Sequence, residues 1–294
     1  MLVTIGIPVY NAENFIWSSI NSILNQTYTN FELIIIDDGS TDRSLSIIKS
    51  FNDKRIRIFH DGENKKLPAR LNQIIELAQG DYIMRMDADD IASEDRLEIL
   101  LKYLEQNKNK DVVFSRICSI KNNGVINGVH GIIRDRNLEI TDLVKGNTGF
   151  PHASLLARKE WCLRNLYNQE NRLSEDFELY LTAFLKGDFK ASIIPNILYF
   201  YREEMNVKYD RVSVAYKSQI KVLDRFKVTN KNEIKIFTKA IYVFKLKLFI
   251  SYIIHVLKLE NVVINMRGGN INNKEMNELS IRISTLMKGS SDEQ

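Results

Sequence analysis

The spacing of apolar residues predicts short buried strands that alternate with amphipathic helices over the first 120 positions. The expected strands cover residues 2–8, 31–36, 55–60, 81–87 and 111–117, and the expected helices cover residues 11–24, 69–79 and 93–106. The run at 31–36 is almost continuously apolar, which is typical of a parallel strand covered on both faces. Strands that alternate with helices form βαβ units around a parallel sheet. The pattern therefore predicts an α/β fold.

Capping residues indicate where these helices begin and end. Asn11 is expected to cap the first helix, and Ser40 or Thr41 is expected to cap the helix after the second strand. Ser93 is expected to begin the helix that follows the strand at 81–87, and Gly80 closes the helix before that strand.

The pattern becomes less regular after residue 118. Residues 118–150 give mixed signals, and they are followed by a strand at 154–157, a helix that opens at Ser174 and ends before Gly187, and short strands at 189–194 and 197–201. Beyond residue 209 the chain is helical, with a last amphipathic stretch at 274–287.

Polar side chains gather where the predicted strands end. They are Tyr10 after the first strand, Asp37 and Asp38 after the second, and Asp87, Asp89 and Asp90 after the fourth. Open α/β sheets bind ligands at the carboxyl ends of their strands. Crowded carboxylates need a cation or hydrogen-bond donors, and oxygen-rich clusters suit Mg²⁺ or Mn²⁺. An isolated Asp-x-Asp is more often a solvated turn, but three coincident strand ends favour a shared ligand site.

The charge is distributed unevenly. The net charge is +4, yet residues 208–267 hold 13 basic and 4 acidic residues, and the remainder holds 28 basic and 33 acidic residues. This distribution favours an anionic surface as partner of the C-terminal region. Lysines interrupt its apolar stretch, so an amphipathic helix lying in a membrane interface fits better than a spanning helix. The alternative is a helix packed on the core or on another subunit.

Composition and cysteine content indicate the cellular compartment in which the protein is expected. The chain is 44% hydrophobic and 27% charged, which is ordinary for a globular protein. Its two cysteines, Cys118 and Cys162, are too few for a disulfide framework or a zinc site, so a reducing compartment is expected. The amino terminus enters a strand at once and lacks the features of a signal peptide. These observations predict a cytoplasmic protein.

Four ordered motifs resemble the family 2 glycosyltransferases. They are TIGIPVYN at 4–11, QTYTNFELIIIDDGSTD at 26–42, ARLN at 69–72, and GDYI leading to MDADD at 80–90. The resemblance covers residues 1–202 and implies a GT-A fold, a Rossmann-like and mostly parallel sheet flanked by helices. We expect a nucleotide-sugar-binding and catalytic domain at 1–204 and a helical, basic, membrane-associating region at 205–294.

The resemblance also implies the donor site. Asp89 would bind Mn²⁺ or Mg²⁺, Asp87 would touch the ribose or the metal's shell, and Ala88 lies between them in the donor-binding set. Asp90 is expected to brace the loop instead of binding the ligand.

A nucleotide base is implied at the ends of the first two strands. Asp38 matches the position that accepts a hydrogen bond from uracil N3–H, with Pro8 and Tyr10 lining the base, while Asp37 is expected to brace the turn. Arg70 would contact the base or a phosphate, or else form a surface ion pair. For Asn72, a role at the nucleotide site and a role in helix packing are equally expected.

Catalytic and acceptor-side residues follow from the same resemblance. Asp176 of the Glu175–Asp176 pair would be the base that deprotonates the acceptor, ionised with help from the helix dipole; simple capping is the alternative. His152 would lie near the acceptor pocket or be structural, and Arg202 would approach the diphosphate. The histidine that commonly follows this arginine in the family is replaced by Glu203-Glu204-Met205, and Trp161 is expected in the core.

The function implied is a metal-dependent, inverting hexosyltransferase. It would move a sugar from a nucleotide diphosphate, UDP-hexose by the Asp38 match, to a lipid-diphosphate-linked saccharide in bacterial O-antigen or capsule synthesis. It would lie at the cytoplasmic face of the inner membrane, and its C-terminal helices could also form a homo-oligomer. The alternatives are a degenerate sugar-nucleotide-binding scaffold and a nucleotidyltransferase, whose glycine- and basic-rich phosphate loop is missing. Nucleic-acid binding is not expected, because no recognition module is recognisable.

Overall fold

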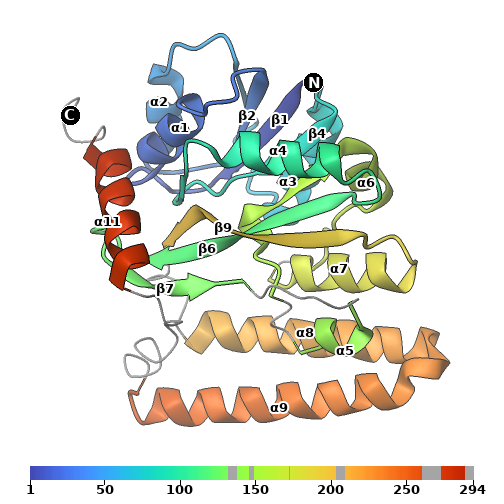
Figure 1. Cartoon of the computed structure of the whole chain (residues 1–294). Helices are drawn as coiled ribbons and strands as arrows, with labels where there is room; N and C mark the ends of the chain where they lie inside the picture. Colours follow the sequence, from blue (N-terminus) through green and yellow to red (C-terminus); the bar gives the residue numbers. More distant parts are fainter. Residues whose placement is uncertain (132–137, 146–148, 172, 203–208, 260–272, 289–294) are drawn as a thin grey trace.

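The computed structural model describes residues 1–131, 138–145, 149–171, 173–202, 209–259 and 273–288. In these residues a nine-stranded mixed sheet has the order β3-β2-β1-β4-β8-β6-β9-β5, with β7 paired to β6 (Figure 1). The strands are β1 (Val3–Val9), β2 (Phe31–Asp37), β3 (Ile56–His60), β4 (Tyr82–Arg85), β5 (Ile91–Ala92), β6 (Val112–Ile120), β7 (Ile126–His130), β8 (Leu156–Arg158) and β9 (Ala191–Arg202). The helices are α1 (Ile16–Leu24), α2 (Ser44–Ser50), α3 (Leu67–Leu77), α4 (Arg96–Gln106), α5 (Ile140–Leu143), α6 (Lys159–Arg164), α7 (Glu175–Leu185), α8 (Tyr209–Thr229), α9 (Ile234–Val256) and α11 (Asn273–Lys288).

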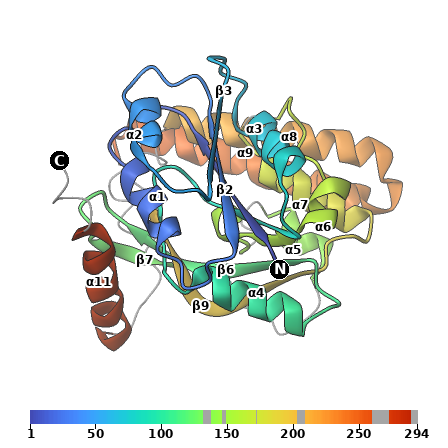
Figure 2. The ribbon, with the colours of Figure 1, turned by 90° about the horizontal axis from the view of Figure 1, so that it is seen from above.

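Strand β2 shows why the sheet is buried on both faces. Leu33 and Ile35 belong to the core under α1, α2 and α4, while Ile34 and Ile36 belong to the core under α3, α6 and α7. Figure 2 shows α8 and α9 together on the side of the sheet away from α4. The predicted α/β class with helical C-terminal extension is therefore confirmed.

The first four strands in the order run parallel, so their carboxyl ends lie at one edge of the sheet. β1 pairs with β2 and with β4, and β2 pairs with β3. β8 then runs antiparallel between β4 and β6. Tyr10, Asp38 and Asp87 follow β1, β2 and β4, and they are thus brought to the same edge, as the sequence predicts.

Buried polar contacts at the opposite edge fix the same strands. Thr4 Oγ1 of β1 donates to Glu32 Oε1 of β2 at 2.6 Å, and it accepts a hydrogen bond from the Gly80 amide, two residues before β4, at 3.0 Å. Glu32 also accepts from the Gln79 amide at 2.6 Å and pairs with Arg57 of β3 at 2.6 Å. Glu32 therefore links the amino-terminal sides of four neighbouring strands.

Three predicted helix starts are wrong. α4 begins at Arg96 with Asp95 at its N-cap position, so Ser93 does not begin it. α1 begins at Ile16, because Asn11 has φ of 50° and cannot begin a right-handed helix there. The Asn11 amide donates to Ser40 Oγ at 3.0 Å, and Asn11 Oδ1 accepts from the Thr41 amide at 2.8 Å. These polar residues join two loops, and α2 begins only at Ser44.

The last strand also differs from the prediction. Two strands were expected at 189–194 and 197–201, but Ala191–Arg202 form the single strand β9. Ser115 pairs with Ile194 and Arg116 with Ile197, so Pro195 and Asn196 are left out of the register. Proline has no amide hydrogen for the ladder and is accommodated at such bulges.

The C-terminal helices pack partly on the core and partly face outward. α8 and α9 form an antiparallel hairpin, and α9 is its outer member (Figure 1). Phe244 of α9 contacts Phe177 of α7 with ring centroids 6.0 Å apart, so the packed-helix alternative is correct for this face. No helix in the described part of the chain is long and apolar enough to cross a membrane. The last predicted stretch forms α11, whose Leu279 and Ile283 pack near β5 and β9.

Candidate active site

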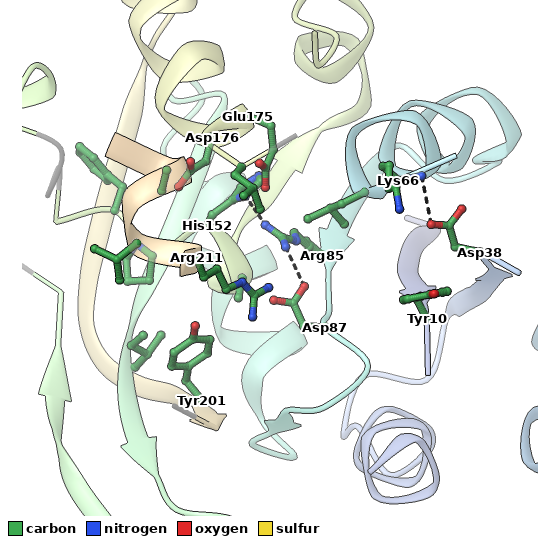
Figure 3. Close-up of a pocket in the computed structure, with 18 of the residues that line it drawn as sticks. Tyr10, Asp38, Lys66, Arg85, Asp87, His152, Glu175, Asp176, Tyr201 and Arg211 are labelled. Carbon is green, nitrogen blue, oxygen red and sulfur yellow. Dashed lines mark hydrogen bonds and ion pairs between the residues drawn. The ribbon is translucent and has the colours of Figure 1, made fainter. Parts of the chain in front are cut away.

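A pocket of about 800 Å³ lies at the carboxyl ends of β1, β2 and β4. It takes side chains from the first loops, from the acidic loop after β4, from the start of α7 and from α8 (Figure 3). The polar lining residues that matter for the chemistry are Tyr10, Asp38, Lys66, Arg85, Asp87, His152, Glu175, Asp176, Tyr201 and Arg211.

One end of the pocket is formed by Tyr10, Asp38 and Lys66. Asp38 Oδ1 accepts hydrogen bonds from the Lys65 amide at 2.7 Å and from Arg70 Nε at 2.8 Å, and Oδ2 accepts from the Lys66 amide at 3.0 Å. Tyr10 is 51% exposed. An exposed aromatic ring beside a fixed carboxylate suits a planar base that carries an N–H donor.

Arg70 holds this end together from behind. It is 1% exposed and pairs with Asp38 at 2.8 Å and with Asp61 at 2.6 Å. Its guanidinium lies outside the pocket lining, so its position is that of a brace for Asp38. The surface ion pair considered as the alternative is in fact buried. Asn72 exchanges hydrogen bonds of 2.9 Å with the backbone of Tyr167, as expected for packing.

The loop after β4 is fixed by β9. Asp90 is fully buried, and it accepts hydrogen bonds from Tyr199 Oη at 2.7 Å and from the Arg202 amide at 2.7 Å. The predicted bracing role of Asp90 is therefore confirmed. Asp37 likewise accepts from the Ser40 amide at 3.1 Å and braces its turn.

Arg202 braces the same loop. Its guanidinium donates to the backbone carbonyl of Asp89 and lies 4.9 Å from the ring centroid of Phe15. Together with Pro8, Ala88 and Asp89, it lies beside the pocket and outside its lining. Direct contacts of these four residues with a donor stay predictions.

The sequence reasoning missed Arg85, whose guanidinium lies in the pocket floor. Arg85 pairs with Asp87 Oδ1 at 2.8 Å, and its other terminal nitrogen contacts His152 Nδ1 (Figure 3). An arginine inside a buried central strand is itself a signal, because charges are buried only when paired. In the sequence, Arg85 stands between the apolar residues Met84 and Met86 of the predicted strand, so its burial could have been predicted.

His152 belongs both to the pocket wall and to the packing around it. Its Nε2 is 2.8 Å from Tyr167 Oη, and it lines the pocket next to Glu175. Burial lowers the pKa of His152 well below its usual range, and the charge of Arg85 lowers it further. The ring is therefore neutral at pH 7 and serves as a polar wall, not as a cation. Trp161 is 1% exposed, as expected for the core.

Glu175 and Asp176 form the wall opposite Tyr10, at the first turn of α7. Burial, and after it the negative charge of the neighbouring Asp176, raises the pKa of Glu175 to about 7. Burial also raises the pKa of Asp176, although the Phe177 amide donates to Oδ1 at 2.7 Å and Arg85 lies nearby. Burial thus outweighs the helix dipole that was expected to favour ionisation, and the pair gains basicity.

The acidic loop fits a divalent cation with few protein ligands. The pKa of Asp89 is raised to about 6, first by burial and then by the negative charge of Asp87. Within the described residues no group of three histidine, cysteine or acidic side chains could hold a metal. Two carboxylates suit Mg²⁺ or Mn²⁺, which usually take their other ligands from phosphate and water.

The sheet order and pocket are those of the GT-A fold class of glycosyltransferases. S. aureus TarS 1-349 in complex with UDP-GlcNAc superposes with a TM-score of 0.58 at 15% identity, covering 98% of this chain and 92% of that one. The mannosyltransferase PcManGT from Pyrobaculum calidifontis, in complex with GDP-Man and Mn²⁺, superposes with a TM-score of 0.60 at 15% identity, covering 99% and 88%. At this identity the likeness shows the fold alone.

Sequence comparison gives the family. The model of Glycosyl transferase family 2 matches residues 4–164. A protein of Haemophilus influenzae called an uncharacterized glycosyltransferase is 32% identical over 258 residues, which are 86% of this chain and 97% of that protein. The chain belongs to glycosyl transferase family 2. The matched residues include the acidic loop and end before Glu175 and Asp176.

Proposed function

We propose that this glycosyltransferase transfers a sugar from a nucleotide-diphosphate donor, by inversion, to a hydroxyl of a saccharide acceptor. The observation that carries the proposal is the order of groups along one pocket. Asp38 and Tyr10 suit a base at one end, Asp87 stands in the middle, and Glu175 and Asp176 lie opposite (Figure 3).

Donor binding would begin at the Asp38 end. Asp38 is held by three donors and presents its carboxylate edge to the pocket, where the N3–H of uracil is the complementary group. UDP is therefore the nucleotide we favour. A solved neighbour contains GDP-Man and another contains UDP-GlcNAc, so a guanine nucleotide is the second choice.

The diphosphate would lie beside Asp87 and Asp89. A bound Mn²⁺ or Mg²⁺ would neutralise the charge of the leaving diphosphate without a proton. Asp89 and Asp87 are the residues that would hold it. Arg85 fixes the Asp87 carboxylate in place through its 2.8 Å ion pair.

The acceptor hydroxyl would lie next to Asp176. The hydroxyl oxygen attacks the anomeric carbon of the donor, and the hydroxyl proton passes to the Asp176 carboxylate. The bond between the anomeric carbon and the diphosphate oxygen breaks, and both of its electrons stay on the leaving diphosphate. Burial raises the pKa of Asp176, which makes it a stronger base than an exposed aspartate. His152 and Glu175 would contact the acceptor or position it.

We also propose that the enzyme works at a membrane surface, on the cytoplasmic face, with a lipid-diphosphate-linked saccharide as acceptor in bacterial surface polysaccharide synthesis. α9 supports this with an exposed apolar stripe along one face, made of Tyr242, Leu246, Phe249, Ile253 and Val256. Lys235, Lys239 and Lys245 are exposed on the same helix. Apolar and basic side chains on one exposed helix suit an anionic lipid interface.

The test combines a donor screen with a base variant. Purified enzyme is given UDP- and GDP-sugars, Mn²⁺ and a lipid-diphosphate acceptor carrying one sugar, and released nucleotide is measured. Asp176→Asn should bind UDP as the wild type does, yet lose about 10²–10⁴-fold in transfer, the usual contribution of a general base. Glu170→Gln, an exposed acid in the preceding loop, is the matched control. Full activity of Asp176→Asn would exclude it as the base.

A further inference from the structure

Three cationic side chains line the pocket within the described residues, and they occupy different places along it. Lys66 lies at the Tyr10 end, with Nζ 5.9 Å from the ring centroid. Arg85 is buried in the floor and is engaged by Asp87 and His152. Arg211 comes from the first turn of α8, and Figure 3 shows its guanidinium pointing toward the carboxylate of Asp87.

Helix α8 is fastened to the segment that carries the proposed base. Ser218 Oγ donates to Asn171 Oδ1 at 2.7 Å, and Ser174 Oγ, one residue before α7, donates to Ser218 Oγ at 2.8 Å. Val222 and Leu223 of α8 are buried in the core that α7 shares. The middle of α8 is thus held against the segment before α7 by contacts independent of any ligand, and Arg211 lies seven residues before Ser218 on the same helix.

The position of Arg211 matches the place where negative charge would accumulate. A nucleoside diphosphate lying beside Asp87 and Asp89 adds its own charge to that of two carboxylates. Arg202 donates to the backbone carbonyl of Asp89 and lies outside the lining. Arg211, by contrast, lines the pocket and faces Asp87 from α8 (Figure 3).

We propose that Arg211 binds the diphosphate of the donor and stabilises it as the leaving group. The inference rests on the proposed function. A guanidinium presents a planar fork of donors that matches phosphate oxygens, and it keeps its charge at every pH of interest. Arg211 lies outside the matched residues 4–164, so the C-terminal region would complete the donor site as well as contact lipid.

Nucleotide binding tests this without turnover. The affinities of the protein for UDP and for uridine are measured by calorimetry, with and without Mn²⁺, and GDP and guanosine are used in parallel. Arg211→Gln should weaken UDP binding about tenfold to hundredfold, the range for a lost charge-assisted hydrogen bond, and leave uridine binding unchanged. Arg211→Lys should recover part of the loss. Lys217→Gln, which changes an exposed cation further along α8, should bind UDP as the wild type does.

The outcomes separate the two proposals. If Arg211→Gln binds UDP as tightly as the wild type, or loses UDP and uridine equally, the role of Arg211 is refuted and the proposed function stands. If the wild type binds neither UDP nor GDP, the proposed donor itself is refuted.

Discussion

Replacing Glu175 by glutamine should stabilise the protein, and more so at high pH. Glu175 is 8% exposed and its pKa is raised to about 7 from 4.5. The folded state therefore binds a proton more tightly than the unfolded state does. The stabilising contribution is complete below about pH 4.5 and is lost as pH rises through about 7.

The size of the effect follows from that difference in pKa. For an isolated group it corresponds to about 3 kcal/mol of unfolding free energy at pH 8. Because Asp176 adjoins Glu175 and contributes to the shift, roughly half of this, about 1.5 kcal/mol, is the expected gain for Glu175→Gln. At pH 5 the gain should fall to about a quarter of its value at pH 8, because Glu175 is then still protonated in the folded state and about three quarters ionised in the unfolded state.

The assay is urea unfolding of the metal-free protein at pH 5 and pH 8, with Glu170→Gln as the control for removing a charge at an exposed position. The difference between wild type and Glu175→Gln should grow between the two pH values, while the control should shift little. A gain of equal size at both pH values, or a loss at pH 8, would refute the burial of an ionisable Glu175.

Two further predictions concern the surface and the sheet. Leu246→Asn and Phe249→Asn, which change α9 residues that are 57% and 60% exposed, should each weaken pelleting with anionic liposomes about tenfold, whereas Val228→Asn at the end of α8 should not; unchanged pelleting would remove the membrane from the proposal. Gly80→Ala should destabilise the protein by about 1–3 kcal/mol in urea unfolding, because a Cβ would lie 2.6 Å from the Thr4 amide nitrogen and 2.8 Å from the Leu2 carbonyl oxygen. Gly62→Ala is the control, because Gly62 has a φ of +76° but no atom lies near the position of an added Cβ, so only the cost of backbone conformation is measured. A loss of unfolding free energy as large as that of Gly80→Ala would contradict the steric explanation.

Residues that are close in sequence to a strand end were the most predictable part of the site. Asp38 and Asp87 were placed correctly because the period of the apolar residues locates the strands, and parallel strands share one carboxyl edge. Asp90 was assigned as a brace from the resemblance to the family.

Long-range contacts account for what the sequence did not show. Arg211 reaches the pocket from a helix 124 positions after Asp87, and the hydrogen bonds that place it join Ser218 to Asn171 and Ser174. Asn11 resembled a helix cap until its partners Ser40 and Thr41, about 30 positions away, were known. The pattern of apolar and polar residues around a position does not show which distant residues that position contacts. The proposed boundary between residues 204 and 205 stays a prediction, although both parts share one core.

The Glu32 contacts have a consequence for the chemistry at the far edge. Side chains of a strand alternate between faces, so sliding β4 by one residue along β1 would move Asp87 about 3.3 Å and reverse the direction of its carboxylate. The pairing of Val3 with Tyr82 and of Val3 with Phe31 prevents this. The contacts of Glu32 with Thr4 and with the Gln79 amide, and of Thr4 with the Gly80 amide, hold that pairing at its beginning. Glu32, which lies outside the pocket lining, thus helps to fix the distance between Asp38, proposed to bind the nucleotide base, and Asp87, proposed to lie beside the diphosphate. A screen for inactive variants should find residues of this amino-terminal edge as readily as residues of the pocket.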